Sequence, residues 1–209
     1  MAAKPSAADG AGANAAGDAV TFLVGPEQTR ITVHRPTLIA ASPVFLDLVA
    51  SCPDALGAGG VPLPEDDADA WALLAGLLQP LCAGLDAITH GNAYSVLELV
   101  DKYDVRGARA LVDCALALHA VAAFKYLRFV RPQGEKDTYN EEVHTDTSIV
   151  IEIINFCATQ GLEKAEATYV ELFMQKLAGA DTKSAPYVMA FADQIESLDL
   201  AKRLLHWKP

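Results

Sequence analysis

The sequence predicts an α+β fold in which a short β-sheet is flanked by a helical cluster and followed by an α-helical C-terminal segment. Three observations support this prediction. In residues 20–24, Val20, Phe22 and Val24 alternate with Thr21 and Leu23, and residues 31–34 alternate apolar and polar side chains; this is the period of half-buried strands. From Pro36 onward, apolar residues recur at helical spacing. A polar stretch at 131–146 contains Pro and Gly and separates the earlier predicted helices from the later ones.

Composition predicts a folded protein with a sizeable core. Of the 209 residues, 52% are apolar and 21% are charged, so the supply of hydrophobic side chains does not limit folding. The formal net charge is −11. An acidic surface repels phosphate backbones and anionic lipids, which makes nucleic acid and membrane surfaces poor partners. The acidity also has a simpler interpretation, since net charge by itself keeps a protein in solution.

The spacing of the cysteines and the composition of the N-terminal residues indicate the cellular compartment of the protein. The four cysteines are widely spaced and form no C-x-x-C motif, which predicts free thiols in a reducing compartment; they are Cys52, Cys82, Cys114 and Cys157. Residues 1–17 lack the apolar core of a secretory signal. No uncharged stretch is both long and apolar enough to span a bilayer. We therefore expect a soluble protein of the cytoplasm, the nucleus or both.

Four parts are expected along the chain. Residues 1–17 are rich in Ala and Gly and are predicted to form a disordered tail, because small side chains bury too little area to offset the entropy of ordering. Residues 18–120 carry the strand and helix patterns of one domain. Residues 121–146 are interpreted as the end of a connecting helix and a polar linker, and residues 147–209 as a helical segment.

The domain is expected to begin with a hairpin and two short helices. Gly25-Pro26 ends the first strand, and the connection to the second strand is short enough for a hairpin turn. Pro36 suits the first turn of a helix, where its missing N–H is not needed. Ser42 can cap a second helix, with Pro43 at its first position. The predicted helices are 36–41 and 43–51.

A third strand and further helices follow. Residues 61–63 form a short edge strand, where Pro62 is tolerated. Three acidic residues then favour a helix N-terminus through the helix dipole; they are Asp66, Asp67 and Asp69. Asn92 is expected to cap the next helix.

The remaining predicted helices lie before and after the linker. A helix at about 107–119 places Arg109 and Asp113 four residues apart, where they can pair on its outer face. After the linker, Gly161 and Gly179 stand where left-handed C-caps belong. The helices predicted there are roughly 147–160, 162–178, 184–197 and 198–207.

No motif for chemistry is present in the sequence. It contains no P-loop, no G-x-S-x-G, no H-E-x-x-H and no G-x-G-x-x-G after a strand. Cys114 and His119 fall on different faces of their predicted helix, and no second pair completes a zinc site. His34 is interpreted as a structural histidine. We therefore expect no catalytic residues, cofactor or metal, and no enzymatic activity.

A basic stripe precedes the linker. Lys125, Arg128 and Arg131 lie three residues apart. They can contact an acidic partner helix, or they can simply stabilise a helix C-terminus while facing solvent. The spacing alone is compatible with both interpretations.

Four pieces of the sequence stand out by their order and spacing. They are Asp18–Gly25 with Phe22 and Val24; Val33-His34-Arg35 followed by Leu38-Ile39-Ala40-Ala41-Ser42-Pro43-Val44-Phe45; Val61–Trp71 with Leu63-Pro64-Glu65-Asp66-Asp67; and Leu97–Val105 with Asp101-Lys102-Tyr103-Asp104. In this order and spacing they resemble the BTB/POZ family. The resemblance extends from Asp18 to about Leu118, nearly the whole of that domain, and a cysteine in its last helix, Cys114, also matches.

The resemblance implies a protein–protein interaction protein, with residues 18–120 as its BTB/POZ domain. Its first implied function is a substrate adaptor of a cullin-3-type ubiquitin ligase, in which the domain binds the cullin-3 scaffold and the C-terminal helices present an unknown target protein. The implied cullin contacts are Phe45, Asp47 and Leu48 of the helical hairpin and the loop after it. Many relatives form homodimers, and here the implied dimer contacts are Val20, Phe22 and Leu38.

The alternative is a homo-oligomerising scaffold or regulatory protein with no role in ubiquitin transfer. Family members that recruit cullin-3 often carry a hydrophobic-x-Glu element between the helical hairpin and the third strand. The corresponding loop here, Ser51–Gly60, contains no Glu. This departure favours the alternative, whereas the frequency of adaptors in the family favours the first function.

Overall fold

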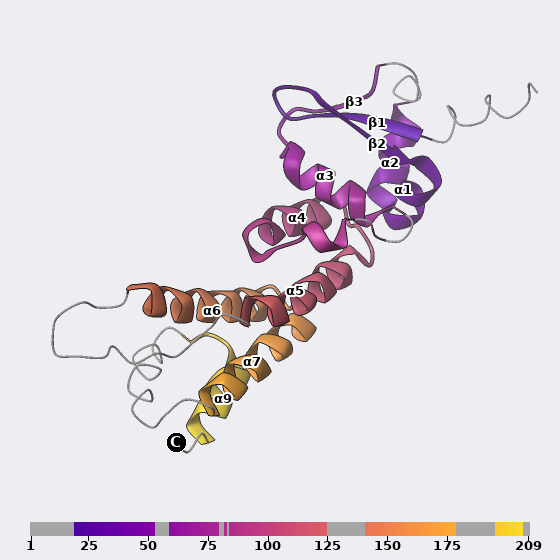
Figure 1. Ribbon diagram of the computed structural model, residues 1–209. Helices are drawn as coiled ribbons and strands as arrows, with labels where there is room; N and C mark the ends of the chain where they lie inside the picture. Colours follow the sequence, from indigo (N-terminus) through magenta and orange to yellow (C-terminus); the bar gives the residue numbers. More distant parts are fainter. Residues whose placement is uncertain are drawn as a thin grey trace, which may run out of the picture. The chain divides into compact units, whose positions relative to one another are not determined.

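The computed structural model describes residues 19–52, 59–79, 82, 84–124, 141–178 and 195–206 (Figure 1). The chain divides into two compact units, each described by itself below. The first comprises Met1–Ala87 with Asn92–Ala108, and the second comprises Ile88–Gly91 with Arg109–Pro209. The division at Ala108 comes earlier than the boundary expected at residue 120. The expected tail at 1–17 and the basic stripe at 125–131 lie outside the described residues.

The first unit contains a three-stranded sheet, which confirms the predicted α+β class. Strands β1 (Ala19–Val24) and β2 (Thr29–His34) form the expected antiparallel hairpin, and β3 (Val61–Leu63) pairs parallel with β1. The strand order is therefore β2-β1-β3, with β1 in the middle (Figure 1). Alternate side chains of β1 point into the core, and Phe22 lies opposite both Ile31 and Val61.

A helical hairpin follows the sheet hairpin, as predicted. Helices α1 (Arg35–Ala41) and α2 (Pro43–Ser51) meet at Ser42. The Ser42 hydroxyl accepts a hydrogen bond from the Phe45 amide at 3.1 Å, which makes Ser42 the N-cap of α2. The same hydroxyl donates to the carbonyl of Tyr103, so the cap also holds a distant part of the chain.

The next helix of the first unit begins at a capping carboxylate, and the one after it follows a short 3-10 turn. Helix α3 (Ala68–Leu77) starts at Asp67, whose carboxylate accepts from the amides of Asp69 at 2.8 Å and Ala70 at 3.2 Å. A short 3-10 turn, η2 (Leu85–Ala87), precedes α4 (His90–Lys102). The expectation that Asn92 caps α4 is wrong, because the helix begins two residues earlier. The Asn92 amide instead donates to the Ala87 carbonyl at 2.9 Å.

Backbone contact between α3 and the segment before η2 leaves no room for a side chain. A Cβ added at Gly76 would lie 3.0 Å from the Gly84 Cα, and one added at Gly84 would lie 3.0 Å from the Gly76 carbonyl carbon. The two backbones also share a hydrogen bond, in which the Gly84 amide donates to the Gly76 carbonyl at 3.3 Å.

We expect Gly76→Ala to lower the free energy of unfolding by about 1–2 kcal/mol, because overpacking outweighs the helix propensity gained. The melting temperature should fall by about 2–8 °C. Gly91→Ala is the matched control, since its nearest neighbour, the Thr89 Oγ1, would lie 3.8 Å from the new Cβ. Thermal unfolding of both variants checks this, and equal melting temperatures would contradict it.

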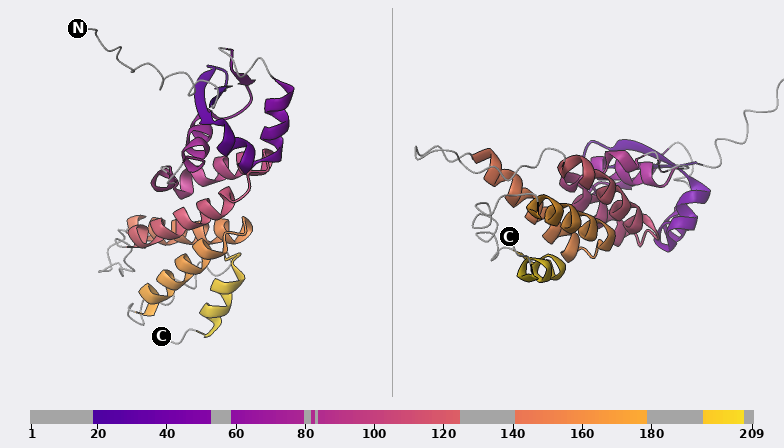
Figure 2. Two further views of the ribbon diagram at one scale, coloured as in Figure 1. Left: turned by 90° about the vertical axis from the view of Figure 1, so that its right-hand side faces the viewer. Right: turned by 60° about the horizontal axis from the view of Figure 1, so that its bottom comes forward.

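The second unit consists of helices. They are α5 (Ala108–Phe124), which starts at the last residue of the first unit, α6 (Glu141–Thr159), α7 (Glu163–Ala178) and α9 (Leu198–His206). Helices α6 and α7 lie side by side, and α9 lies along α7 (Figure 2). Gly161 adopts the left-handed conformation predicted for it, with a φ of 65°.

Two expectations for this part of the chain need correction. The linker predicted to extend to residue 146 is helical from Glu141 onward. The helix predicted at 184–197 falls mostly outside the described residues, as does Gly179, and residues 195–197 are not helical. The predictions of helices at 162–178 and 198–207 agree with α7 and α9 to within a residue at each end.

Two side chains of α5 cap the turn between α6 and α7. The Asp113 carboxylate accepts from the amides of Lys164 at 3.1 Å and Ala165 at 2.6 Å, at the N-terminus of α7. The Arg109 guanidinium donates to the Gln160 carbonyl at 2.6 Å, at the end of α6. The sequence predicted contact between Arg109 and Asp113 only. Their bonds to the turn fix α5 against both following helices.

Candidate functional site

The candidate site is the outer surface of α2. Because successive helical residues turn by about 100°, Phe45 and Val49 share the inner face, Asp47 lies opposite Phe45, and Val44 and Leu48 lie along the flank between them. We call Val44, Asp47 and Leu48 the α2 ridge. Val44 is 39% exposed, Asp47 is exposed, and Leu48 is half-buried. The ridge therefore offers two aliphatic side chains one turn apart with a carboxylate beside them, a pattern suited to contact with another protein surface.

Of the three predicted cullin contacts, two lie on the surface of α2 and one is buried beneath it. Asp47 and Leu48 belong to the ridge, whereas Phe45 is fully buried. The Phe45 side chain cannot touch a partner in this conformation, because it fills the core beneath α2. Its role is to hold the helix in place.

The three predicted dimer contacts are also buried within the single chain. Val20, Phe22 and Leu38 each have 0% exposed surface. They sit on the inner faces of β1 and α1, where alternation and helical period direct apolar side chains toward the core. A second copy could reach these side chains only if the core opened, so any contact with it must be made by other residues.

Four aromatic side chains form the core under the site. Phe45 stacks on Tyr103 at a centroid distance of 4.8 Å, and Phe22 lies 4.7 Å from Trp71. Trp71 also meets Tyr103 edge-on at 5.4 Å. Such pairs each contribute about 0.5–1.5 kcal/mol beyond the burial of area. The four residues come from the four separate sequence pieces noted above, which thus meet in one cluster.

A buried carboxylate completes this core. Asp66 is 7% exposed and accepts three hydrogen bonds, from the Trp71 indole N–H at 2.8 Å, the Tyr103 hydroxyl at 2.5 Å and the Lys102 ammonium at 2.5 Å. Burial alone would raise the pKa of Asp66. The bonds from Lys102, Tyr103 and Trp71 outweigh burial, so its pKa is lowered below the ordinary value.

The same contacts correct one prediction. Asp67 caps α3 and Asp69 lies in its first turn, as predicted, whereas Asp66 precedes the cap and accepts bonds within the core. The Lys102 side chain is 51% exposed, and its ammonium group binds the buried Asp66. Burial and the bond to Asp66 raise the pKa of Tyr103, which therefore stays a neutral donor.

Comparisons with family models, curated proteins and solved structures give no match.

An acidic hollow of about 550 Å³ opens beside the buried carboxylate. It is lined by Glu65, Asp66, Asp67, Ser95, Glu98, Leu99, Asp101 and Lys102. Within the described ranges, no group of three or more His, Cys, Asp or Glu side chains is placed to hold a metal ion. Asp66 has three donors in place, so its carboxylate acts as a structural acceptor.

A second exposed apolar surface lies on α5. Its outward residues fall within about 100° of arc and are all uncharged; they are Ala110, Leu111, Cys114, Leu118 and Val121. Leu118 and Val121 are each 63% exposed. The charged side chains Arg109 and Asp113 are turned toward the α6–α7 turn instead. Helix α5 therefore has an exposed apolar side.

All four cysteines are free thiols. Cys157 is the most buried, and its burial, followed by the nearby charges of Asp113 and Glu166, raises the pKa of its thiol to about 12. It is therefore neutral and unreactive near pH 7. Among the helices that the structure describes, none has the length and apolar character needed to cross a membrane.

Proposed function

We propose that the protein is a non-enzymatic protein–protein interaction module with a BTB/POZ fold in its first unit. The observation that carries this proposal is the convergence of the four family-like sequence pieces in one core, through Phe22, Phe45, Trp71 and Tyr103. The residues that carry the resemblance are thus used for folding. Free thiols fit a cytoplasmic or nuclear location, which forms part of the proposal.

The first candidate function is a substrate adaptor of a cullin-3-type ubiquitin ligase. The α2 ridge supports it, because Val44, Asp47 and Leu48 combine apolar surface with a carboxylate on one side of a short helix. The core beneath fixes the helix, since Ser42 caps it and Phe45 anchors it. A preorganised helix surface loses little entropy on binding. The C-terminal helices would then present the target.

The test is co-elution of the chain with an N-terminal cullin-3 fragment on size-exclusion chromatography, with light scattering to give the mass of the complex. We expect a complex with the wild-type chain, and we expect Leu48→Asp to weaken it by at least about 30-fold, as for a central contact residue. Leu118→Asp is the matched control, because it places the same charge on an exposed leucine of α5. It should bind as wild type does.

One outcome would contradict the adaptor function: no complex at tens of micromolar from a wild-type chain that is folded by circular dichroism. Equal binding by Leu48→Asp and Leu118→Asp would contradict the α2 ridge as the contact.

The second candidate function is a homo-oligomerising scaffold. The absence of Glu from the Ser51–Gly60 loop favours it. Light scattering of the chain alone distinguishes the two, because the monomer has a mass of 22.2 kDa. A dimer that fails to bind cullin-3 would support the scaffold, whereas a monomer would exclude it.

A further inference from the structure

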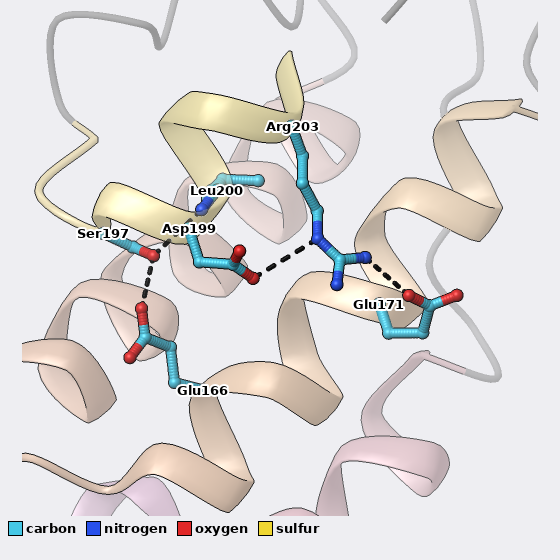
Figure 3. A network of polar contacts seen from close by, with 6 residues as sticks. All are labelled: Glu166, Glu171, Ser197, Asp199, Leu200 and Arg203. Carbon is cyan, nitrogen blue, oxygen red and sulfur yellow. Dashed lines mark hydrogen bonds and ion pairs between the residues drawn. The ribbon is translucent and has the colours of Figure 1, made fainter. Parts of the chain in front are cut away.

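Helix α9 is attached to α7 at its first turn through Ser197. The Ser197 hydroxyl accepts from the Leu200 amide at 3.2 Å, which caps α9, and donates to the Glu166 carboxylate of α7 at 2.6 Å (Figure 3). The Asn155 side chain of α6 accepts from the amides of Glu196 at 2.8 Å and Ser197 at 3.2 Å. Side chains of α6 and α7 thus recognise both the backbone and the cap of this helix.

One turn further on, Arg203 bridges two carboxylates. It donates to Glu171 of α7 at 2.6 Å and pairs with Asp199 of α9 itself at 3.3 Å (Figure 3). The bond from Arg203 holds the pKa of Glu171 below its ordinary value. Together with Glu166, Glu171 makes this side of α7 acidic, so that it is complementary to a basic helix.

Among the residues that the structure describes, α9 fully buries one apolar side chain. That side chain is Leu200, while Leu205 is 82% exposed. The ion pairs of Arg203 are 40–52% exposed at both partners, and such surface pairs contribute little to stability. A nine-residue helix is also marginal on its own in water. Helix α9 should therefore detach at a much lower free energy than the rest of its unit unfolds.

We propose that Asn155, Glu166 and Glu171 mark a helix-docking site on α6 and α7, which α9 occupies in cis and which accepts a short amphipathic helix from a partner protein. The pattern of contacts specifies that helix. It carries a hydroxyl cap, a leucine three residues later and an arginine three residues after that, as Ser197, Leu200 and Arg203 do. The site lies within the second unit and does not depend on the BTB or cullin-3 proposals.

The test uses the full chain carrying Leu200→Asp, which releases α9 while the docking residues stay intact. The probe is a fluorescent peptide of residues 195–206, and its binding is measured by fluorescence anisotropy. We expect the peptide to bind this variant and to bind the wild-type chain at least about tenfold more weakly, because the tethered α9 competes at an effective concentration in the millimolar range.

A charge exchange supplies the matched control. Adding Glu171→Arg to the Leu200→Asp chain should weaken binding of the peptide through charge repulsion, and a peptide with Arg203→Glu should bind that chain better than the wild-type peptide does. A Leu200→Asp chain that is folded by circular dichroism but does not bind the peptide would overturn the proposal. A wild-type dimer that Leu200→Asp dissolves would also overturn it, by showing that the natural occupant is α9 of a second copy.

Hydrogen exchange of the wild-type chain provides a second measurement, which holds even where Leu200→Asp impairs folding. Amides of α9 should exchange well before those of α7. Exchange of α9 only through global unfolding would overturn the proposal, since a helix that never detaches leaves no site for a partner.

Discussion

Replacing Asp66 with asparagine is expected to lower the free energy of unfolding by about 3 kcal/mol at pH 7. The change removes a buried charge that accepts bonds from Trp71, Tyr103 and Lys102. The side-chain amide of asparagine accepts at most two hydrogen bonds, through its oxygen. At least one of the three donors is therefore left without a hydrogen-bond acceptor. Urea denaturation of both chains measures the difference. Asp69→Asn is the matched control, because Asp69 is exposed, and it should cost under about 0.5 kcal/mol.

The effect should also depend on pH, in a direction fixed by the lowered pKa of Asp66. Since the folded state favours the carboxylate, its contribution is fully present above the unfolded pKa of about 4 and is lost as the pH falls through the lower folded pKa. The gap between wild type and Asp66→Asn should therefore be widest near neutrality and shrink below about pH 4. A gap that stays constant down to pH 3 would contradict this account of Asp66.

Replacing Phe45 with alanine should be at least as damaging, with an expected cost of about 3–5 kcal/mol. The ring is fully buried and lies within 6 Å of three other aromatic rings, those of Phe22, Trp71 and Tyr103. Its removal leaves a cavity at the centre of the first unit. Urea denaturation again gives the measurement. Leu46→Ala, at a neighbouring residue that is 47% exposed, is the control and should change stability little.

The Phe45 result also bears on the proposed cullin contact. If Phe45 acts through folding, Phe45→Ala should lose binding only in proportion to the fraction of unfolded chain. Leu48→Asp should lose binding while the chain stays folded. A stable, folded Phe45→Ala chain that fails to bind would contradict an effect of Phe45 through overall stability alone.

The parts of the fold that were predicted correctly depend on local signals. The hairpin, α1, α2 and β3 each begin or end next to a turn or cap residue, such as Gly25, Ser42 or Gly60. Asp66 was misassigned because its partners Lys102 and Tyr103 are 36 and 37 residues away. Helical period shows which residues share a face. It does not show which distant segment that face meets, so the caps that Arg109 and Asp113 provide were also missed.

The candidate site could have been predicted more fully. Phe45 and Val49 are four residues apart, which places both on one face of a helix that starts at Pro43. That spacing was sufficient to assign Phe45 to the core and the ridge residue Asp47 to the opposite, exposed side. For the docking residues of α7, no sequence signal was sufficient, because Glu166 and Glu171 acquire their role only through contact with α9.

The aromatic cluster has a consequence for synthesis of the protein on the ribosome. Its first ring, Phe22, is made 81 residues (103 − 22) before its last, Tyr103. At elongation rates of about 5–20 residues per second, roughly 4–16 s pass before the cluster can close. During that interval Phe22, Phe45 and then Trp71 emerge without their final partner. We therefore expect nascent chains to be bound by chaperones until Tyr103 has left the exit tunnel, and to be released soon afterwards.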